Sequence, residues 1–288
     1  MDESSEYEAD LPNFFDKNSW KVDEIYRVSI ENIYDPSKFW IRFAPVDVFQ
    51  KHLWDFYNTE GESLSLKLSE ISVGMNCVAL ISNLYYRGKI VRTNIQDNRM
   101  FQIFLYDFGM VTKVGLSQLY HLDKRYYEIP AFAVRAMLAN INTLDHEMWD
   151  QRAVNRFQEL TSGKTLIAQI AHVHGKRKIL EIDLLDTSLQ QKGKIPTINY
   201  RLVCEGFAKI AWHPPIKKNG NSPFKPLKKY LYLYPSFEMI ENGLTPSQEY
   251  MTEQLAYSIP WDVLFPNFYQ YQGTTEFLKS LLNIVEFV

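Results

Sequence analysis

The chain has 288 residues, of which 46% are hydrophobic and 15% aromatic, with a net charge of −3 and a pI near 6.1. This length fits one large or two small domains with a sizeable core, and the mildly acidic balance argues against a strongly basic nucleic-acid binder while suiting a cationic partner. Two distant cysteines, Cys77 and Cys204, supply neither a disulfide framework nor a metal-ligand pair, which is typical of a reducing compartment.

Membrane spans, metal sites and a leader are also not expected. No segment approaches ~18 consecutive apolar residues, so we expect no transmembrane helix. His172 and His174 are close in sequence but lack nearby cysteines or suitably spaced carboxylates, so we interpret them as surface residues and expect no metal and no cofactor. Residues 1–20 are acidic and polar, do not resemble a secretory signal, and are expected to be flexible.

The first elements in chain order are two strands and a helix. Strands are predicted over residues 24–33 and 38–43, because the residues between them, Tyr-Asp-Pro-Ser, form a strong turn signal. Apolar residues then recur at helical spacing, which predicts a helix over 46–58 that the polar, glycine-containing residues 59–63 terminate.

Short strands follow in close succession. They are predicted over residues 77–81, 84–92, 100–107, 111–114 and 119–122. A polar turn is expected at 94–99 and a bend at Gly109. Strands this short, joined by tight turns, favour a small, strongly bent barrel.

The residue pattern then returns to alternating strands and helices. A strand is predicted over 133–140, a helix over 145–160, a hairpin with strands 166–173 and 179–185, and a helix over 198–207. The helix at 145–160 places Trp149, Ala153, Phe157 and Leu160 on one face. Because this unit begins before the small barrel and resumes after it, we infer that one domain is inserted into another.

The last part of the chain has a different composition. Prolines and a glycine after residue 213 indicate a linker. Thr245, Pro246 and Gln248 then form a capping signature that predicts a helix to about Tyr257. Another amphipathic helix is predicted over 275–285, so residues 213–288 are interpreted as a proline-rich linker and a helical extension.

Residues 74–122 resemble a Tudor barrel, in which a G-x-x-C/V-x-A start precedes a W-Y-R-A segment and a Y-x-D-Y-G-N turn. The matching residues here are Val73-Gly74, Cys77-Val78-Ala79, Tyr85-Tyr86-Arg87, Lys89-Ile90-Val91, Tyr106-Asp107-Phe108-Gly109, Val114, Leu119 and Leu122. Each motif is weak alone, but their order and spacing together are specific.

The flanking residues resemble a second module, the staphylococcal-nuclease-like OB-fold. The matching residues are Ile129-Pro130, Ala133, Ala136, Trp149, Ala153, Phe157, Gly163-Lys164, Leu184, Asp186, Leu202-Val203, Gly206 and Ala208. Over roughly residues 22–212 the chain therefore resembles an extended Tudor domain of the Tudor-domain-containing piRNA-pathway proteins. The implied fold is β-rich α+β. A Tudor barrel at about 70–122 is inserted into a nuclease-like module (21–45 and 126–212) through the linker helix 46–58.

The resemblance implies a binding site for arginine in the N-terminal tails of Piwi-family proteins, often as symmetric dimethylarginine, formed by four aromatic residues and an asparagine. Carried over by position, the four aromatic positions fall on Leu80 (or its neighbour Ile81), Tyr86, Leu105 and Phe108, and the asparagine on Met110. Two aromatic residues of four remain and the amide is absent, so the cage is degenerate.

Four residues next to these positions are expected to have structural roles. Asp107 is expected to hold the turn and to pair with Arg87, rather than to contact a ligand. Tyr85 and Tyr106 are expected to point away from Tyr86 and Leu105, since successive side chains of a strand alternate, and to pack in a core or between domains.

Three functions are compatible with these residues. The first is a non-catalytic reader of an arginine-containing Piwi-tail peptide, methylated or not, acting with other piRNA-pathway proteins in cytoplasmic, perinuclear germline granules. The second is a scaffold that has lost arginine reading and binds partners elsewhere, for example through the C-terminal helices. The third, a nuclease, is disfavoured because Glu181, Asp183 and Asp186 lack matching arginines. RNA binding is not expected, given the net charge.

Overall fold

The computed structural model describes residues 20–43, 46–93, 100–144, 149–186, 197–211 and 236–243. The chain divides into two compact units, of which the first comprises residues 1–216 and 241–243. A short helix, α4 (Phe237–Glu241), spans the boundary between the units and lies where we expected a linker. The two predicted C-terminal helices lie outside the described residues.

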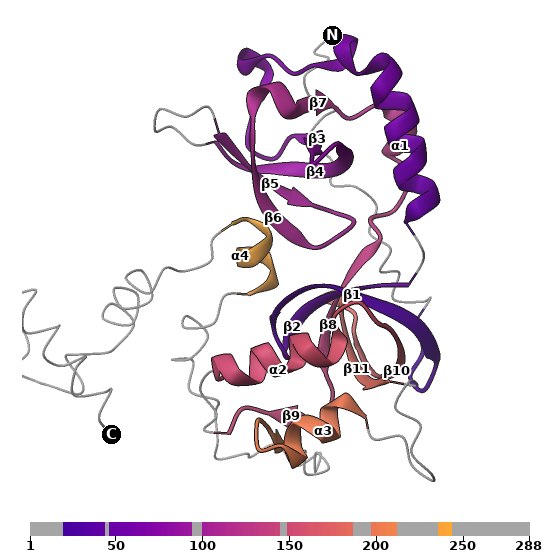
Figure 1. Ribbon diagram of the computed structural model, residues 1–288, viewed down its shortest axis with the longest axis vertical. Helices are drawn as coiled ribbons and strands as arrows, with labels where there is room; N and C mark the ends of the chain where they lie inside the picture. Colours follow the sequence, from indigo (N-terminus) through magenta and orange to yellow (C-terminus); the bar gives the residue numbers. More distant parts are fainter. Residues whose placement is uncertain are drawn as a thin grey trace, which may run out of the picture. The chain divides into compact units, whose positions relative to one another are not determined.

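Five strands form a closed barrel in the order β1-β10-β11-β8-β2 (Figure 1). They are β1 (Ile25–Asp35), β2 (Lys38–Arg42), β8 (Ala133–Leu138), β10 (Thr165–His174) and β11 (Ile179–Leu185). The β8–β11 pair is parallel and the others are antiparallel. Register shifts in β1 and β10 supply the extra twist that closing a five-stranded barrel requires. The predicted insertion is confirmed, because β2 and β8 pair across everything between them.

Two helices cover this barrel. Helix α2 (Gln151–Thr161) buries Phe157 against Phe39 of β2, with ring centroids 5.0 Å apart, and helix α3 (Ile198–Cys204) packs against β11. The predicted start of α2 at residue 145 was wrong. Asp150 is the N-cap, its carboxylate accepting from the Arg152 N–H at 2.7 Å, and Trp149 precedes the helix. Helix α3 ends before the expected residue 207, because Gly206 adopts φ +77°.

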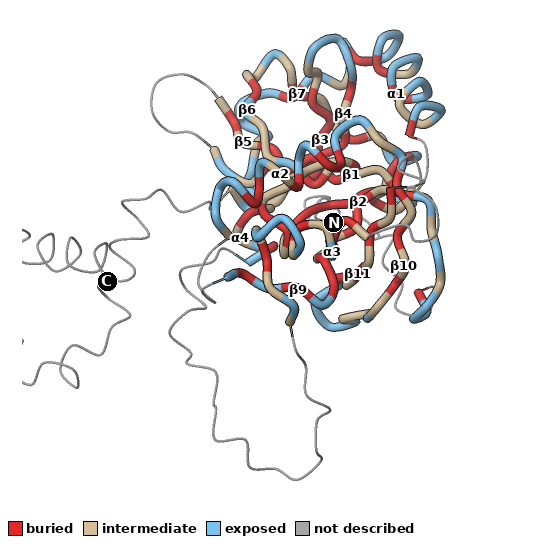
Figure 2. The backbone as a smooth tube through the Cα atoms, turned by 60° about the horizontal axis from the view of Figure 1, so that its bottom comes forward, coloured by how far each residue is buried: buried red, intermediate tan, exposed pale blue. Residues whose placement is uncertain are grey.

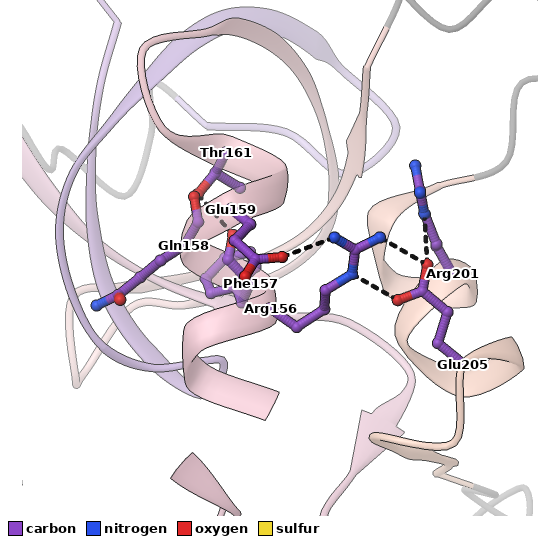
Figure 3. A network of polar contacts seen from close by, with 7 residues as sticks. All are labelled: Arg156, Phe157, Gln158, Glu159, Thr161, Arg201 and Glu205. Atoms are coloured by element: carbon purple, nitrogen blue, oxygen red, sulfur yellow. Dashed lines mark hydrogen bonds and ion pairs between the residues drawn. The ribbon is translucent and has the colours of Figure 1, made fainter. Parts of the chain in front are cut away.

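Figure 3 shows how α2 and α3 are joined by a network of charged side chains. The Arg156 guanidinium donates to both carboxylate oxygens of Glu205, at 2.7 and 3.0 Å, and to Glu159 at 2.8 Å. Arg201 also donates to Glu205, at 2.8 Å. These guanidinium hydrogen bonds, that of Arg156 first, lower the pKa of Glu205 to about 2.

A second set of strands lies between β2 and β8 in the sequence. Strands β3 (Asn76–Ile81), β4 (Leu84–Thr93), β5 (Met100–Leu105), β6 (Met110–Gly115) and β7 (Leu119–His121) pair in the order β6-β5-β4-β3-β7. The predicted strands are thus present, but over the described residues their hydrogen bonds form an open five-stranded sheet, not a closed barrel. A two-stranded sheet of β9 (Ile141–Asn142) and β12 (Lys209–Ile210) completes the strands.

The five-stranded sheet buries a separate hydrophobic cluster on each face. One, which we call the sheet core, includes Cys77, Ile90, Ile103 and Leu105. The other joins Val78, Tyr85 and Phe104 to helix α1 (Asp47–Glu60) and to residues 122–131; we call it the helix-side cluster. Helix α1 confirms the predicted linker helix. Most of its length is exposed (Figure 2), and its buried residues are Leu53 and Tyr57.

Candidate functional site

A tight turn between β5 and β6 presents Phe108. The N–H of Gly109 donates to the carbonyl of Leu105 at 2.9 Å, and Gly109 adopts φ +66°, a backbone conformation that glycine tolerates without strain. Strand β5 ends at Leu105, not at 107, because the N–H groups of Phe108 and Gly109 both turn back to the Leu105 carbonyl.

The pairing of β3 with β4 separates one expected cage position from the others. Leu80 lies opposite Tyr85 and Ala79 opposite Tyr86, and directly paired residues share a sheet face. Leu80 therefore packs on the helix-side cluster, whereas Ile81, Tyr86 and Phe108 pack on the sheet core. The Leu80 assignment places that residue on the wrong face.

The two-residue turn Ser82-Asn83 is the signal that would have corrected this assignment. Both residues have positive φ, 49° and 63°, as a type I′ hairpin turn requires. Such a turn fixes Ile81 opposite Leu84 and hence fixes the face of every residue in the two strands. Counting six residues back from Tyr86 without this register led to Leu80, and its neighbour Ile81 has the correct orientation.

The remaining expected positions differ in accessibility. Tyr86 and Phe108 lie edge to face, with ring centroids 5.2 Å apart and an interplanar angle of 71°, and both are half-buried. Leu105 is only 2% exposed and belongs to the sheet core. Met110, at the asparagine position, is 39% exposed. The structure thus brings together one aromatic pair with aliphatic and thioether neighbours.

Arg42 at the end of β2 is a site residue that the sequence did not indicate. Its guanidinium carbon lies 5.3 Å from the centroid of Phe108, and its Nη2 pairs with Glu31 at 2.9 Å. Both side chains are largely buried, and within the described residues the buried Nε of Arg42 has no hydrogen-bond partner. The ring of Phe108 is therefore already covered by the Arg42 guanidinium, which comes from the closed barrel.

The turn at Gly109 is docked on the β1–β2 hairpin. The Asn32 side-chain amide donates to the Gly109 carbonyl at 2.7 Å. Trp40 lies so close that a Cβ added at Gly109 would be 2.0 Å from Trp40 Cγ. These contacts explain how a residue of the closed barrel reaches Phe108, because the two sheets meet directly at this turn.

Arg87 and Asp107 form a fully buried brace behind the site. Arg87 donates to both Asp107 oxygens, from Nη2 at 2.7 Å and from Nε at 3.1 Å. Its other N–H groups donate to the carbonyls of Tyr126, Ile129 and Pro130. All five guanidinium donors are used, so the expected structural pairing of Asp107 with Arg87 is what the structure shows.

Tyr85 and Tyr106 point away from the site, as the alternation of side chains predicts. Tyr85 packs on Tyr57 of α1, with centroids 5.3 Å apart. The Tyr106 hydroxyl donates to the buried Asn76 side chain. Both belong to the helix-side cluster, so neither is available to a ligand at Tyr86 and Phe108.

The carboxylates considered for a nuclease do not assemble a metal site. Glu181 interacts with His174 at 3.1 Å and Asp186 with Lys164 at 2.7 Å, at opposite ends of β11. Burial, with the nearby Glu181 charge, raises the pKa of Asp183. Among the described residues no group of three or more potential ligands gathers. No described helix has the length and apolarity to cross a bilayer.

Part of the chain is similar to known proteins. A family model of the Tudor domain matches residues 21–140. Tudor domain-containing protein 6 of Homo sapiens is 26% identical over 166 residues, covering 56% of this chain and 8% of that protein. Tudor domain-containing protein 5 of Bos taurus is 30% identical over 170 residues, covering 56% of this chain and 17% of that protein. The chain thus spans under a fifth of the length of these relatives.

Solved extended Tudor domains share the fold. The human TDRD1 domain in complex with a symmetrically dimethylated peptide has a TM-score of 0.60 and 16% identity, covering 70% of this chain and 96% of that chain. The BmPAPI domain in complex with sDMA has a TM-score of 0.54 and 25% identity, covering 64% and 98%. A point mutant of the Drosophila melanogaster Papi domain, in complex with an unmethylated Piwi N-terminal peptide, has a TM-score of 0.58 and 18% identity, covering 65% and 100%. The family model therefore places a Tudor domain over residues 21–140, and the described residues adopt the fold of an extended Tudor domain.

Proposed function

We propose that the chain is a non-catalytic interaction module that binds an arginine-containing tail peptide of a Piwi-family protein without depending on symmetric dimethylation. Related extended Tudor domains support the ligand class. The mouse TDRD1 domain was solved with a dimethylated MILI peptide, and the Papi point mutant with a Piwi peptide in methylated and in unmethylated form. We accordingly expect other piRNA-pathway proteins as partners and cytoplasmic germline granules as the location.

The composition of the site supports the second part of this proposal, that binding does not depend on symmetric dimethylation. Dimethylation removes N–H donors from a guanidinium and adds apolar area, so its recognition relies on several aromatic walls, each contributing ~0.5–2 kcal/mol. Of the expected cage positions, only Tyr86 and Phe108 supply rings here, and Met110 offers no amide to fix the remaining N–H. Leu105, at the third aromatic position, is buried and adds no ring to the site. The remaining aromatic surface is therefore too small to favour a methylated over an unmethylated arginine.

Arg42 favours the alternative, a scaffold that no longer reads arginine. Its guanidinium lies over Phe108, the same ring that a peptide arginine would use, and Glu31 holds it there. Two cations cannot share one aromatic face without repulsion. An arginine peptide must therefore displace Arg42 or bind beside it on Tyr86, and either route lowers its affinity.

Binding of a fluorescent, unmethylated Piwi-tail peptide, followed by anisotropy, tests both functions together. If the site reads arginine, Tyr86→Ala weakens binding about tenfold and replacing the peptide arginine by alanine weakens it equally, whereas Arg42→Gln strengthens it by removing the competing cation. Tyr200→Ala is the matched control, because Tyr200 is 56% exposed on α3. Binding that none of these changes affects would show that the arginine-reading function has been lost.

A further inference from the structure

A groove of about 840 Å³ opens beside helix α1. One wall is formed by α1 and the residues that follow it, and the other by residues 123–129. Its apolar lining residues are Phe49, Phe56, Leu64, Tyr126 and Ile129. All belong to the helix-side cluster, so the groove lies on the face of the five-stranded sheet opposite to Tyr86 and Phe108.

The floor of the groove is aromatic. Phe49 and Phe56 stand edge to face against Tyr126, with centroids 6.0 and 5.8 Å apart. Phe49 and Phe56 are only half-buried, although α1 has a buried face of its own through Leu53 and Tyr57. Arg87 covers one face of Phe49, with its guanidinium carbon 4.5 Å from the ring centroid, so a ligand would meet only the remaining exposed part of these rings.

The rim of the groove is acidic. Its charged and titratable residues are Asp55, Glu60, Asp123, Arg125 and His52. Asp123 is paired with Arg125, at 2.7 Å from its Nε. Within the described part of the chain, no ion pair involves the exposed carboxylates of Asp55 and Glu60. Two negative charges are therefore left for a ligand, above aromatic rings.

Arg125 demonstrates which chemistry this groove accepts. Its guanidinium carbon lies 4.0 Å from the centroid of Phe56, a stacking distance, while its Nε donates to Asp123. The Arg125 side chain is 57% exposed, so desolvation does not force this position. The chain's own arginine thus occupies an aromatic face under a carboxylate, the combination that recognises guanidinium groups.

We propose that this groove is a second binding site, which takes a basic side chain of an extended peptide, with arginine preferred over lysine. Asp55 and Glu60 attract the cation, and its flat guanidinium face displaces the exposed Arg125 side chain from Phe56 or lies beside it on the aromatic floor. The same carboxylates repel phosphate, so the groove does not suit a nucleic acid. The site goes beyond the proposed function, because it uses none of the residues around Phe108.

The test uses the full-length chain carrying Tyr86→Ala, which removes the contribution of the first site. The probe is a fluorescent arginine–glycine repeat peptide, titrated at low salt because the attraction is electrostatic. Adding Asp55→Asn and Glu60→Gln should weaken binding at least fivefold, and a lysine–glycine peptide should bind less tightly than the arginine peptide. The control adds Glu62→Gln and Glu128→Gln, an equal charge change at exposed residues that do not line the groove, and should change affinity less than twofold.

Equal losses in the groove variant and its charge-matched control would overturn the proposal, since they would show only a net-charge effect. So would an absence of peptide binding in the Tyr86→Ala background. A fluorescent oligouridine that binds more tightly than the peptide would also contradict it. All variants in this test carry Tyr86→Ala, so its result does not depend on the site at Phe108. A negative result would disprove the groove site but not the proposed function, and loss of the proposed function would not disprove the groove site.

Discussion

At the scale of single residues, the site depends on one buried ion pair and one glycine. Arg87 and Asp107 are 0% and 3% exposed, and their hydrogen bonds tie β4, the turn after β5 and the exit segment 126–130 together. Gly109 allows that turn to lie against Trp40. Neither the ion pair nor the glycine offers a group to a ligand, yet both set the position of Phe108.

Asp107→Asn should destabilise the fold by about 3–5 kcal/mol, because it leaves the Arg87 cation buried without a counter-charge. Urea unfolding followed by circular dichroism measures this loss. Glu159→Gln is the control: its pair with Arg156 lies at the surface and should be worth less than about 1 kcal/mol. A loss at Asp107 no larger than the control would mean that the pair is not the brace we describe.

Gly109→Ala should be more destabilising than Gly74→Ala. Both glycines have positive φ, +66° and +97°, so both substitutions carry a backbone penalty of about 1 kcal/mol. Only at Gly109 does the new Cβ meet another residue, at 2.0 Å from Trp40, whereas nothing lies within 4 Å at Gly74. Thermal unfolding of the two variants compares them directly, and equal losses would contradict the close docking of the turn on Trp40.

At the scale of elements, charged side chains between helices supplement the hydrophobic packing. Glu205 accepts from Arg156 of α2 and from Arg201 of its own helix, and it lies near the surface, with 28% of its side chain exposed. Its pKa falls from 4.5 to about 2. A carboxyl whose pKa is lowered by folding stabilises the fold above its unfolded pKa and loses that effect as the pH falls.

Glu205→Gln should therefore lower stability by about 0.5–1 kcal/mol at neutral pH and by nothing near pH 2. Between these limits the difference should decline from about pH 4.5 toward pH 2, since that is the window between the unfolded and folded pKa values. Chemical unfolding of both proteins across this range gives the curve. A difference that persists unchanged at pH 2 would indicate a packing effect instead.

Most elements could be predicted from the sequence because their signals are local. The turn at Asp35, Pro36 and Ser37 and the helical spacing through α1 each depend on a few adjacent residues. The helix start at 145 failed because the apolar residue Trp149 matched the helical face, while the Asp150 cap decides the first turn. The orientation of Leu80 failed for a related reason, since strand register follows the hairpin turn and not residue counting.

At the scale of the whole molecule, the candidate site is shared by the two sheets. Phe108 and Tyr86 come from the five-stranded sheet, whereas Arg42, Glu31 and Asn32 come from the closed barrel. Arg42 and Phe108 are far apart in sequence, and no local pattern links them. The proximity of Tyr86 and Phe108 could therefore be predicted from motif spacing, but the cation that covers Phe108 could not.

The central claim is that the site reads arginine without requiring its methylation. Isothermal titration of the full chain with two Piwi-tail peptides, identical except for one symmetrically dimethylated arginine, tests it most directly. We predict equal affinities, or tighter binding of the unmodified peptide, because only Tyr86 and Phe108 supply rings and no amide stands at Met110. A tenfold preference for the methylated peptide would contradict the account.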